Sequence, residues 1–108
     1  MSTLGPWTLV VLAGILEIVW ALGFKYVRDD APWLLRAGVF AALVVSFVLL
    51  VAALRQLPAG TAYAVWTGIG ASGVAIIGMI AFGEPATAAR VLFIGVIVAG
   101  IIGLRLAS

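Results

Sequence analysis

One carboxylate in this sequence is set apart by its surroundings. Glu17 lies in the middle of AGILEIVWALG, residues 13–23, where every other residue is apolar. The nearest basic residue, Lys25, follows eight positions later, roughly 12 Å along a helix axis. An unpaired carboxylate in the middle of a bilayer costs at least about 2.5 to 3.5 kcal/mol, so Glu17 must be protonated, hydrated or neutralised by a bound cation. A proton and a cationic substrate would compete for it, which is the thermodynamic basis of proton-coupled antiport. The alternative is a permanently protonated acid, hydrogen-bonded within a bundle.

Polar and aromatic residues at a similar depth extend this candidate site. Trp20 follows Glu17 by about one helical turn, and Ser46 is the polar residue in the middle of a second apolar run. Tyr63 and Trp66 are again one turn apart in a third run. An acid, a hydroxyl and several aromatic rings suit a flat or hydrophobic cation, through hydrogen bonds to the carboxylate and attraction to ring faces. Helix packing would explain the aromatic residues alone, but beside a membrane carboxylate we favour a binding role.

The elements that position these residues are predicted to be membrane spans. The chain has 108 residues, of which 66% are hydrophobic and 9% charged, whereas a soluble domain is about half apolar and about a quarter charged. A helix needs roughly 20 apolar residues to cross a hydrocarbon core. We therefore predict an all-α integral membrane protein, a single domain over residues 1–108, with four short transmembrane helices at about 6–26, 33–54, 58–82 and 85–105.

The connections between these spans are very short, so successive helices must run antiparallel. Pro58 and Pro85 are suited to the first turns of the third and fourth helices. Glu84 and Arg90 flank the last turn, and there we expect solvated side chains in preference to an ion pair.

Basic residues are distributed with only a modest bias between the two sides of the predicted bundle. Four belong to one side and two, with the amino terminus, to the other: Lys25, Arg28, Arg36 and Arg90 against Arg55 and Arg105. A modest bias permits insertion in both orientations, so an antiparallel homodimer of dual topology is our hypothesis. Scattered cations form no basic patch, and we expect no nucleic-acid partner. Without His, Cys or paired carboxylates, we also expect no metal, no cofactor, no catalytic residues and no enzyme.

Two sets of small residues have candidate roles. Gly95, Ala99 and Gly103 recur at four-residue spacing, a pattern that lets helix backbones approach closely in lipid. Because four helices scarcely enclose a polar pathway, we interpret this stripe as dimer packing, with packing inside one chain as the alternative. In the third span we interpret Gly68, Gly70 and Gly73, with Gly78, as candidate hinge points, and close packing is again the alternative.

Four motifs give the sequence a family resemblance. GILEIVWALGFKY, SFVLL, LPAGTAYAVWTGIGA and FGEPATAAR resemble the small multidrug resistance transporters along essentially the whole chain. Trp20, the GTAYAVWTGIGA stretch and the EP-TA-R turn are similar to the guanidinium-exporter branch of that family. The multidrug branch usually has Gly at the Trp20 position and lacks that turn.

The resemblance implies an antiparallel homodimer in the bacterial inner membrane, with one central site open to each side alternately. In that branch, the residue matching Glu17 in both subunits binds guanidinium or protons. Residues matching Ser46 and Trp66 hydrogen-bond the glutamates, and those matching Trp20 and Tyr63 line the site. Guanidinium carries forked donors that pair with carboxylates and stays protonated at physiological pH. It cannot lose its own proton to leave, so a Glu that takes up another proton is needed to displace it.

Other functions stay open at this point. Within transport, the alternative is an exporter of quaternary ammonium and other lipophilic cations. A small dual-topology channel would also need few helices and balanced charge, although a midplane Glu disfavours anions. A purely structural membrane subunit would tolerate loss of the carboxylate.

Overall fold

Residues 5–107, which the computed structural model describes, form four helices joined by short connections. They are α1 (Pro6–Tyr26), α2 (Trp33–Leu54), α3 (Ala59–Ala81) and α4 (Ala88–Ala107). The shortest has 20 residues and the longest 23, and each is long and apolar enough to cross a membrane. The prediction of an all-α chain with four membrane-capable helices is confirmed.

Proline residues mark the starts of the first three helices. Pro6 is the first residue of α1, and Pro32 and Pro58 immediately precede α2 and α3. Proline suits these positions because its ring fixes φ near the helical value and because the first helical N–H groups have no partner within the helix.

The fourth helix starts differently, and the expected start at Pro85 is wrong: α4 begins at Ala88. The hydroxyl of Thr87 accepts a hydrogen bond of 3.2 Å from the backbone N–H of Arg90, which is the geometry of a helix N-cap. Pro85 disfavours helical backbone in the residue before it, and Gly83 turns the chain with a φ of +70°. The side-chain cap at Thr87, rather than the proline, therefore fixes where α4 begins.

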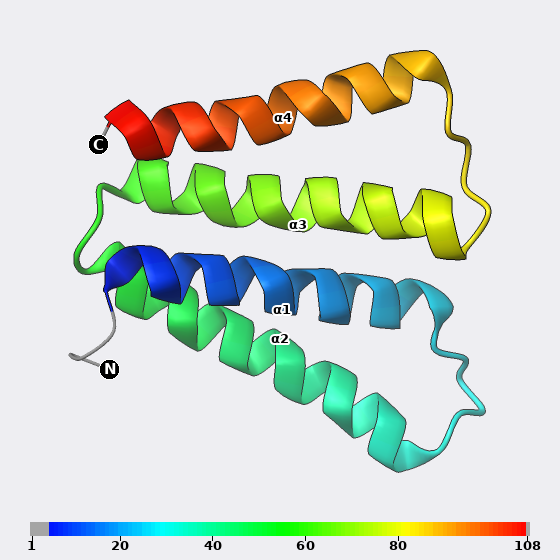
Figure 1. Cartoon of the computed structure of the whole chain (residues 1–108). Helices are drawn as coiled ribbons and strands as arrows, with labels where there is room; N and C mark the ends of the chain where they lie inside the picture. The colour runs from blue at the N-terminus through cyan, green and yellow to red at the C-terminus, as the bar shows by residue number, and fades with distance from the viewer. Residues whose placement is uncertain (1–4, 108) are drawn as a thin grey trace.

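The helices are arranged side by side, with α1 packed against both α2 and α3, and α4 at the edge against α3 (Figure 1). The α1–α2 and α3–α4 connections lie at one end of the bundle, and the α2–α3 connection lies at the other (Figure 1). In the same view α2 diverges from α1 toward the end that holds the α1–α2 connection. This topology brings the last turn of α1 and the α3–α4 connection to the same end.

The buried apolar core lies near the α2–α3 connection and is built by three helices. It contains side chains from the start of α1, the end of α2 and the start of α3: Leu9, Val10, Ala13, Leu50, Ala53, Ala62, Val65 and Trp66. None of the described residues of α4 is buried, although Ile101 and Leu104 pack against the edge of this core. The fourth helix is therefore peripheral within one chain.

Glycines on α1 and α3 lie where neighbouring helices approach closely. A β-carbon added at Gly14 would be 2.8 Å from the Ile69 side chain, and one at Gly68 would be 2.9 Å from that of Ile101. Gly73 faces the side chain of Ile18 in the same way. Gly68 and Gly73 are thus close-packed in this structure, and a hinge role for the α3 glycines stays a prediction.

Gly14→Ala should lower the free energy of unfolding by about 1 to 3 kcal/mol, because the new methyl group meets the β-carbon of Ile69 and the backbone must shift. The measurement is unfolding in detergent micelles. Gly38→Ala on α2 is the matched control, because open space surrounds that position. The control should be neutral or stabilising, since Ala is the better helix former. Equal destabilisation of both variants would contradict this assignment of close packing.

Candidate functional site

The Glu17 carboxylate lies at the contact between α1 and α3. An added β-carbon at Gly70 would overlap the Glu17 side chain, so the carboxylate occupies the space that a larger residue would need. The carboxylate oxygen Oε1 is buried and has no hydrogen-bond partner among residues 5–107. A buried polar atom without a partner is rare and calls for an explanation such as a bound ion, water or ligand.

A cavity of about 290 Å³ opens beside Glu17. Its other walls come from α1, α3, the α3–α4 connection and the first turn of α4: Ala21, Thr67, Gly70, Ala71, Val74, Ala75, Glu84 and Arg90. Most of these side chains are small, and the charged ones lie toward the end of the bundle that holds the α3–α4 connection. The cavity, which we call the Glu17 groove, has room for several waters or a small organic cation, since a water fills about 30 Å³ of liquid.

Ser46 and Trp66 form a buried hydrogen-bonded chain that ends on α1. The indole Nε1 of Trp66 donates to Ser46 Oγ at 3.1 Å, and Ser46 Oγ donates to the carbonyl oxygen of Ala13 at 2.7 Å. In helical geometry this carbonyl also accepts from the backbone N–H of Glu17. The chain therefore joins α2 and α3 to the turn of α1 that carries Glu17. The resemblance implies hydrogen bonds from Ser46 and Trp66 to the glutamate, but in this structure those donors are used elsewhere.

The predicted aromatic residues are connected through Phe47, which the sequence analysis missed. The Phe47 ring stacks on Trp20 with centroids 6.3 Å apart, and it meets Trp66 edge-on at 5.1 Å. Tyr63 contacts Trp66 at 5.5 Å but is 57% exposed. The position of Phe47 directly after Ser46 was the available signal. None of these four rings lines the Glu17 groove.

Trp20 has a second feature that bears on the site. Its indole Nε1 is buried and, like Glu17 Oε1, finds no hydrogen-bond partner in the described part of the chain. An unmatched donor and an unmatched acceptor thus lie about one turn apart on α1. Both groups are thus buried without satisfying their hydrogen-bonding capacity within the described part of the chain.

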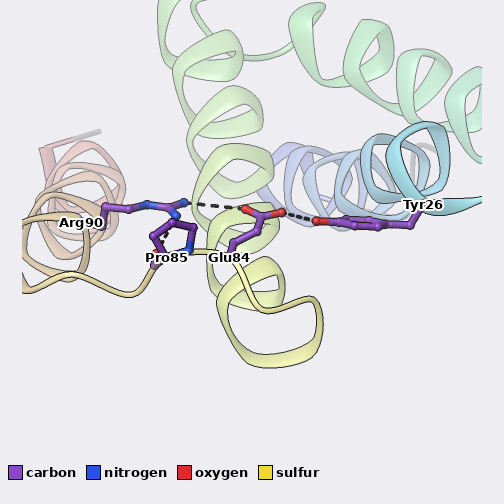
Figure 2. Close-up of polar contacts among 4 residues, drawn as sticks. All are labelled: Tyr26, Glu84, Pro85 and Arg90. Carbon is purple, nitrogen blue, oxygen red and sulfur yellow. Dashed lines mark hydrogen bonds and ion pairs between the residues drawn. The ribbon is translucent and has the colours of Figure 1, made fainter.

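A polar cluster at the end of the bundle was also missed by the sequence analysis (Figure 2). The hydroxyl of Tyr26 donates to Glu84, and Arg90 Nη2 lies 3.8 Å from Glu84 Oε1. Arg90 Nη1 also donates to the carbonyl oxygen of Pro85 at 2.6 Å. The expectation that Glu84 and Arg90 would be solvated and unpaired is wrong. They pair because the Gly83 turn folds Glu84 back over Gly78, whose lack of a β-carbon leaves room for the carboxylate.

The small-residue stripe of α4 is uncovered within one chain. Open space surrounds the positions where Gly95 and Gly103 would carry a β-carbon, and Ala99 between them is exposed. In this respect the stripe differs from the close-packed glycines of α1 and α3.

Comparison with known proteins identifies the family. A sequence profile described as Small Multidrug Resistance protein matches residues 5–97. The chain belongs to the small multidrug resistance family. Proteins named guanidinium exporter from Yersinia pseudotuberculosis serotype I and Citrobacter freundii are both 51% identical to it over 102 residues. These alignments cover 94% of this chain and 98% and 97% of the relatives. A protein of the same name from Salmonella typhimurium strain LT2 is 49% identical.

Membership of the small multidrug resistance family confirms the resemblance drawn from the motifs. The relatives are named as exporters, which are transporters and not enzymes. Four membrane-capable helices in a transporter family make this chain a multi-pass membrane protein. Its outward side chains fit lipid contact, since large apolar residues such as Ile80 and Leu106 are 81% and 80% exposed.

Ser46→Ala should lower the free energy of unfolding by about 1 to 3 kcal/mol, because it leaves Trp66 Nε1 buried without an acceptor. Unfolding followed by tryptophan fluorescence in micelles measures the change. Ser72→Ala is the control, since Ser72 is also a buried residue but its hydroxyl bonds only to carbonyls of its own helix. A similar loss in the two variants would show that the Trp66–Ser46–Ala13 chain contributes nothing specific.

Proposed function

We propose that this protein exports guanidinium or related guanidinyl cations in exchange for protons, and that Glu17 binds the cation and the proton in turn. The observation that carries the proposal is the buried Glu17 oxygen without a partner, beside a groove large enough for a small cation. A planar guanidinium ion offers paired N–H donors that match the two oxygens of a carboxylate. The name of the relatives, guanidinium exporter, points to the same class of substrate.

We further propose that the working unit is an antiparallel homodimer of dual topology in the bacterial inner membrane. The uncovered stripe of Gly95, Ala99 and Gly103 on the peripheral helix supports a contact through α4. A second copy also explains why Tyr63 is exposed and why the aromatic cluster lies apart from the Glu17 groove. In the dimer, Trp20, Tyr63 and the pair Ser46 and Trp66 would complete the site around both glutamates.

Alternating access follows in this proposal from two identical chains that adopt different shapes and exchange them. Bending of α3 near Gly68, Gly70 or Gly73 would allow the exchange. The structure guides the choice of substitution for testing this bending. Alanine at Gly70 would displace the Glu17 carboxylate itself, whereas alanine at Gly73 meets the Ile18 side chain and leaves the carboxylate in place. Gly73→Ala is therefore the cleaner substitution for exchange-rate measurements.

Guanidinium uptake into proteoliposomes tests the transport proposal. With the lumen more acidic than the outside, wild type should accumulate guanidinium as protons leave, and Glu17→Gln should abolish this uptake because amides do not ionise. Asp30→Asn is the matched control, since Asp30 is an exposed carboxylate outside the groove; it should retain uptake.

Other results of the same experiment would support the alternatives. Electrical flux of guanidinium without proton exchange would indicate a channel. Transport of tetraphenylphosphonium without guanidinium transport would indicate a multidrug exporter. Unchanged uptake in Glu17→Gln would remove Glu17 from the mechanism.

A bulky residue on the α4 stripe tests the dimer. Gly103→Leu should shift the protein from dimer to monomer in dilute micelles, because the side chain would fill the space where the second backbone packs. Cross-linking yield and light scattering measure the shift. Gly38→Leu adds the same side chain at another open position and should remain dimeric. A dimeric Gly103→Leu protein would place the interface elsewhere.

A further inference from the structure

The second carboxylate that lines the Glu17 groove is Glu84, at the end of the bundle. Glu84 is joined to Tyr26, which follows Glu17 by nine positions on α1. At 1.5 Å per residue, the cluster lies about 14 Å along the helix axis from the level of Glu17. The groove therefore has one acid deep in the membrane span and another at its mouth.

The geometry of the cluster leaves part of the Glu84 carboxylate available. Its Oε2 accepts the hydroxyl of Tyr26, whose ring is held by stacking on Phe82 with centroids 3.7 Å apart. The other oxygen, Oε1, lies 3.8 Å from Arg90 Nη2, which is beyond hydrogen-bond length. Arg90 gives its short hydrogen bond of 2.6 Å to the Pro85 carbonyl instead. One side of the carboxylate is thus fixed, and the other is only loosely engaged (Figure 2).

Arg90, the loosely engaged partner of Glu84, carries the same chemical group as the proposed substrate. Arg90 ends in a guanidinium group, so Glu84 and Arg90 form a carboxylate–guanidinium pair within the chain. The side chains of Glu84 and Arg90 are 29% and 35% exposed, so ions can reach the pair. A free guanidinium ion carries the same charge and the same kind of N–H donors as the head group of Arg90.

The groove walls between Glu17 and Glu84 are apolar, so a second carboxylate would assist the entry of a cation. Ala21, Ala71, Val74 and Ala75 line the groove with apolar groups that offer a cation no compensation for lost water. A carboxylate at the mouth raises the local concentration of cations before they enter. We propose that Glu84 is a second cation-binding carboxylate through which guanidinium passes to and from Glu17, and that Arg90 competes with the cation for it. This inference rests on the proposed function.

Opposite effects of removing the two partners test this proposal. In proteoliposomes, Glu84→Gln should raise the KM for guanidinium roughly threefold to tenfold, because the second cation-binding carboxylate is lost. Arg90→Gln should lower the KM by roughly threefold to tenfold, because the side chain that competes for Glu84 is lost. If the Glu84–Arg90 pair only stabilised the α3–α4 connection, either substitution would break it. The KM would then change in the same direction in both variants.

The exposed pair of Arg28 and Asp30 provides matched controls at the same end of the bundle. Its N···O distance is 3.1 Å, its side chains are 82% and 73% exposed, and neither residue lines the Glu17 groove. Arg28→Gln and Asp30→Asn should leave the KM within about twofold of wild type, because exposed charges are well screened. If the KM changed in these two controls as much as in the Arg90 and Glu84 variants, the effect would be one of general surface charge. That result would overturn the proposal.

A binding measurement distinguishes cation binding at Glu84 from cation binding at Glu17. In Glu17→Gln protein, added guanidinium should shift the ¹⁵N resonance of the Arg90 side chain, whereas equal sodium chloride should not. The shift should disappear in the double variant with Glu84→Gln. Absence of any shift, with wild type still transporting guanidinium, would overturn this inference alone. Absence of guanidinium transport by wild type would overturn the proposed function and this inference with it.

Discussion

The position of one carboxylate between two helices constrains the rest of this structure. Hydrocarbon offers no water to Glu17 Oε1, so neighbouring residues must leave space for whatever neutralises the acid. Gly70 supplies that space on α3, and small side chains keep the adjoining groove open. The nearby Ser46 hydroxyl is committed to Ala13, which holds the helix turn without satisfying the carboxylate. The protein thus fixes the backbone that carries the acid and leaves the acid itself available.

The helices were predictable because each is a long apolar block and three of them start at or just after a proline. The start of α4 was not, because two signals compete there. Pro85 is suited to a first turn. The Thr87 hydroxyl, however, can cap a helix that begins at the next residue, Ala88. The Gly83 turn, which draws Glu84 back onto α3, further separates Pro85 from the helix.

The candidate site residues could be predicted from two features of the sequence: their spacing along one helix and their depth within a predicted span. Glu17 and Trp20 are one turn apart on α1, so their proximity follows from helical periodicity. Phe47 could not be selected in this way, because its role depends on how α2 packs between Trp20 and Trp66. The hydrogen bond between Tyr26 and Glu84 joins residues 58 positions apart. Such contacts depend on the arrangement of helices, which periodicity does not encode.

The peripheral place of α4 has a consequence for biosynthesis. Within residues 5–107, every buried core residue belongs to α1, α2 or α3, and these helices leave the ribosome before α4 does. Translation adds roughly 5–20 residues per second, so the N-terminal part of the chain emerges first. The three core helices are therefore outside the ribosome before α4 has fully emerged, and α4 can dock on a core that is already assembled. Addition of α4 is then a separate assembly step, in which the chain gains the exposed stripe of Gly95, Ala99 and Gly103.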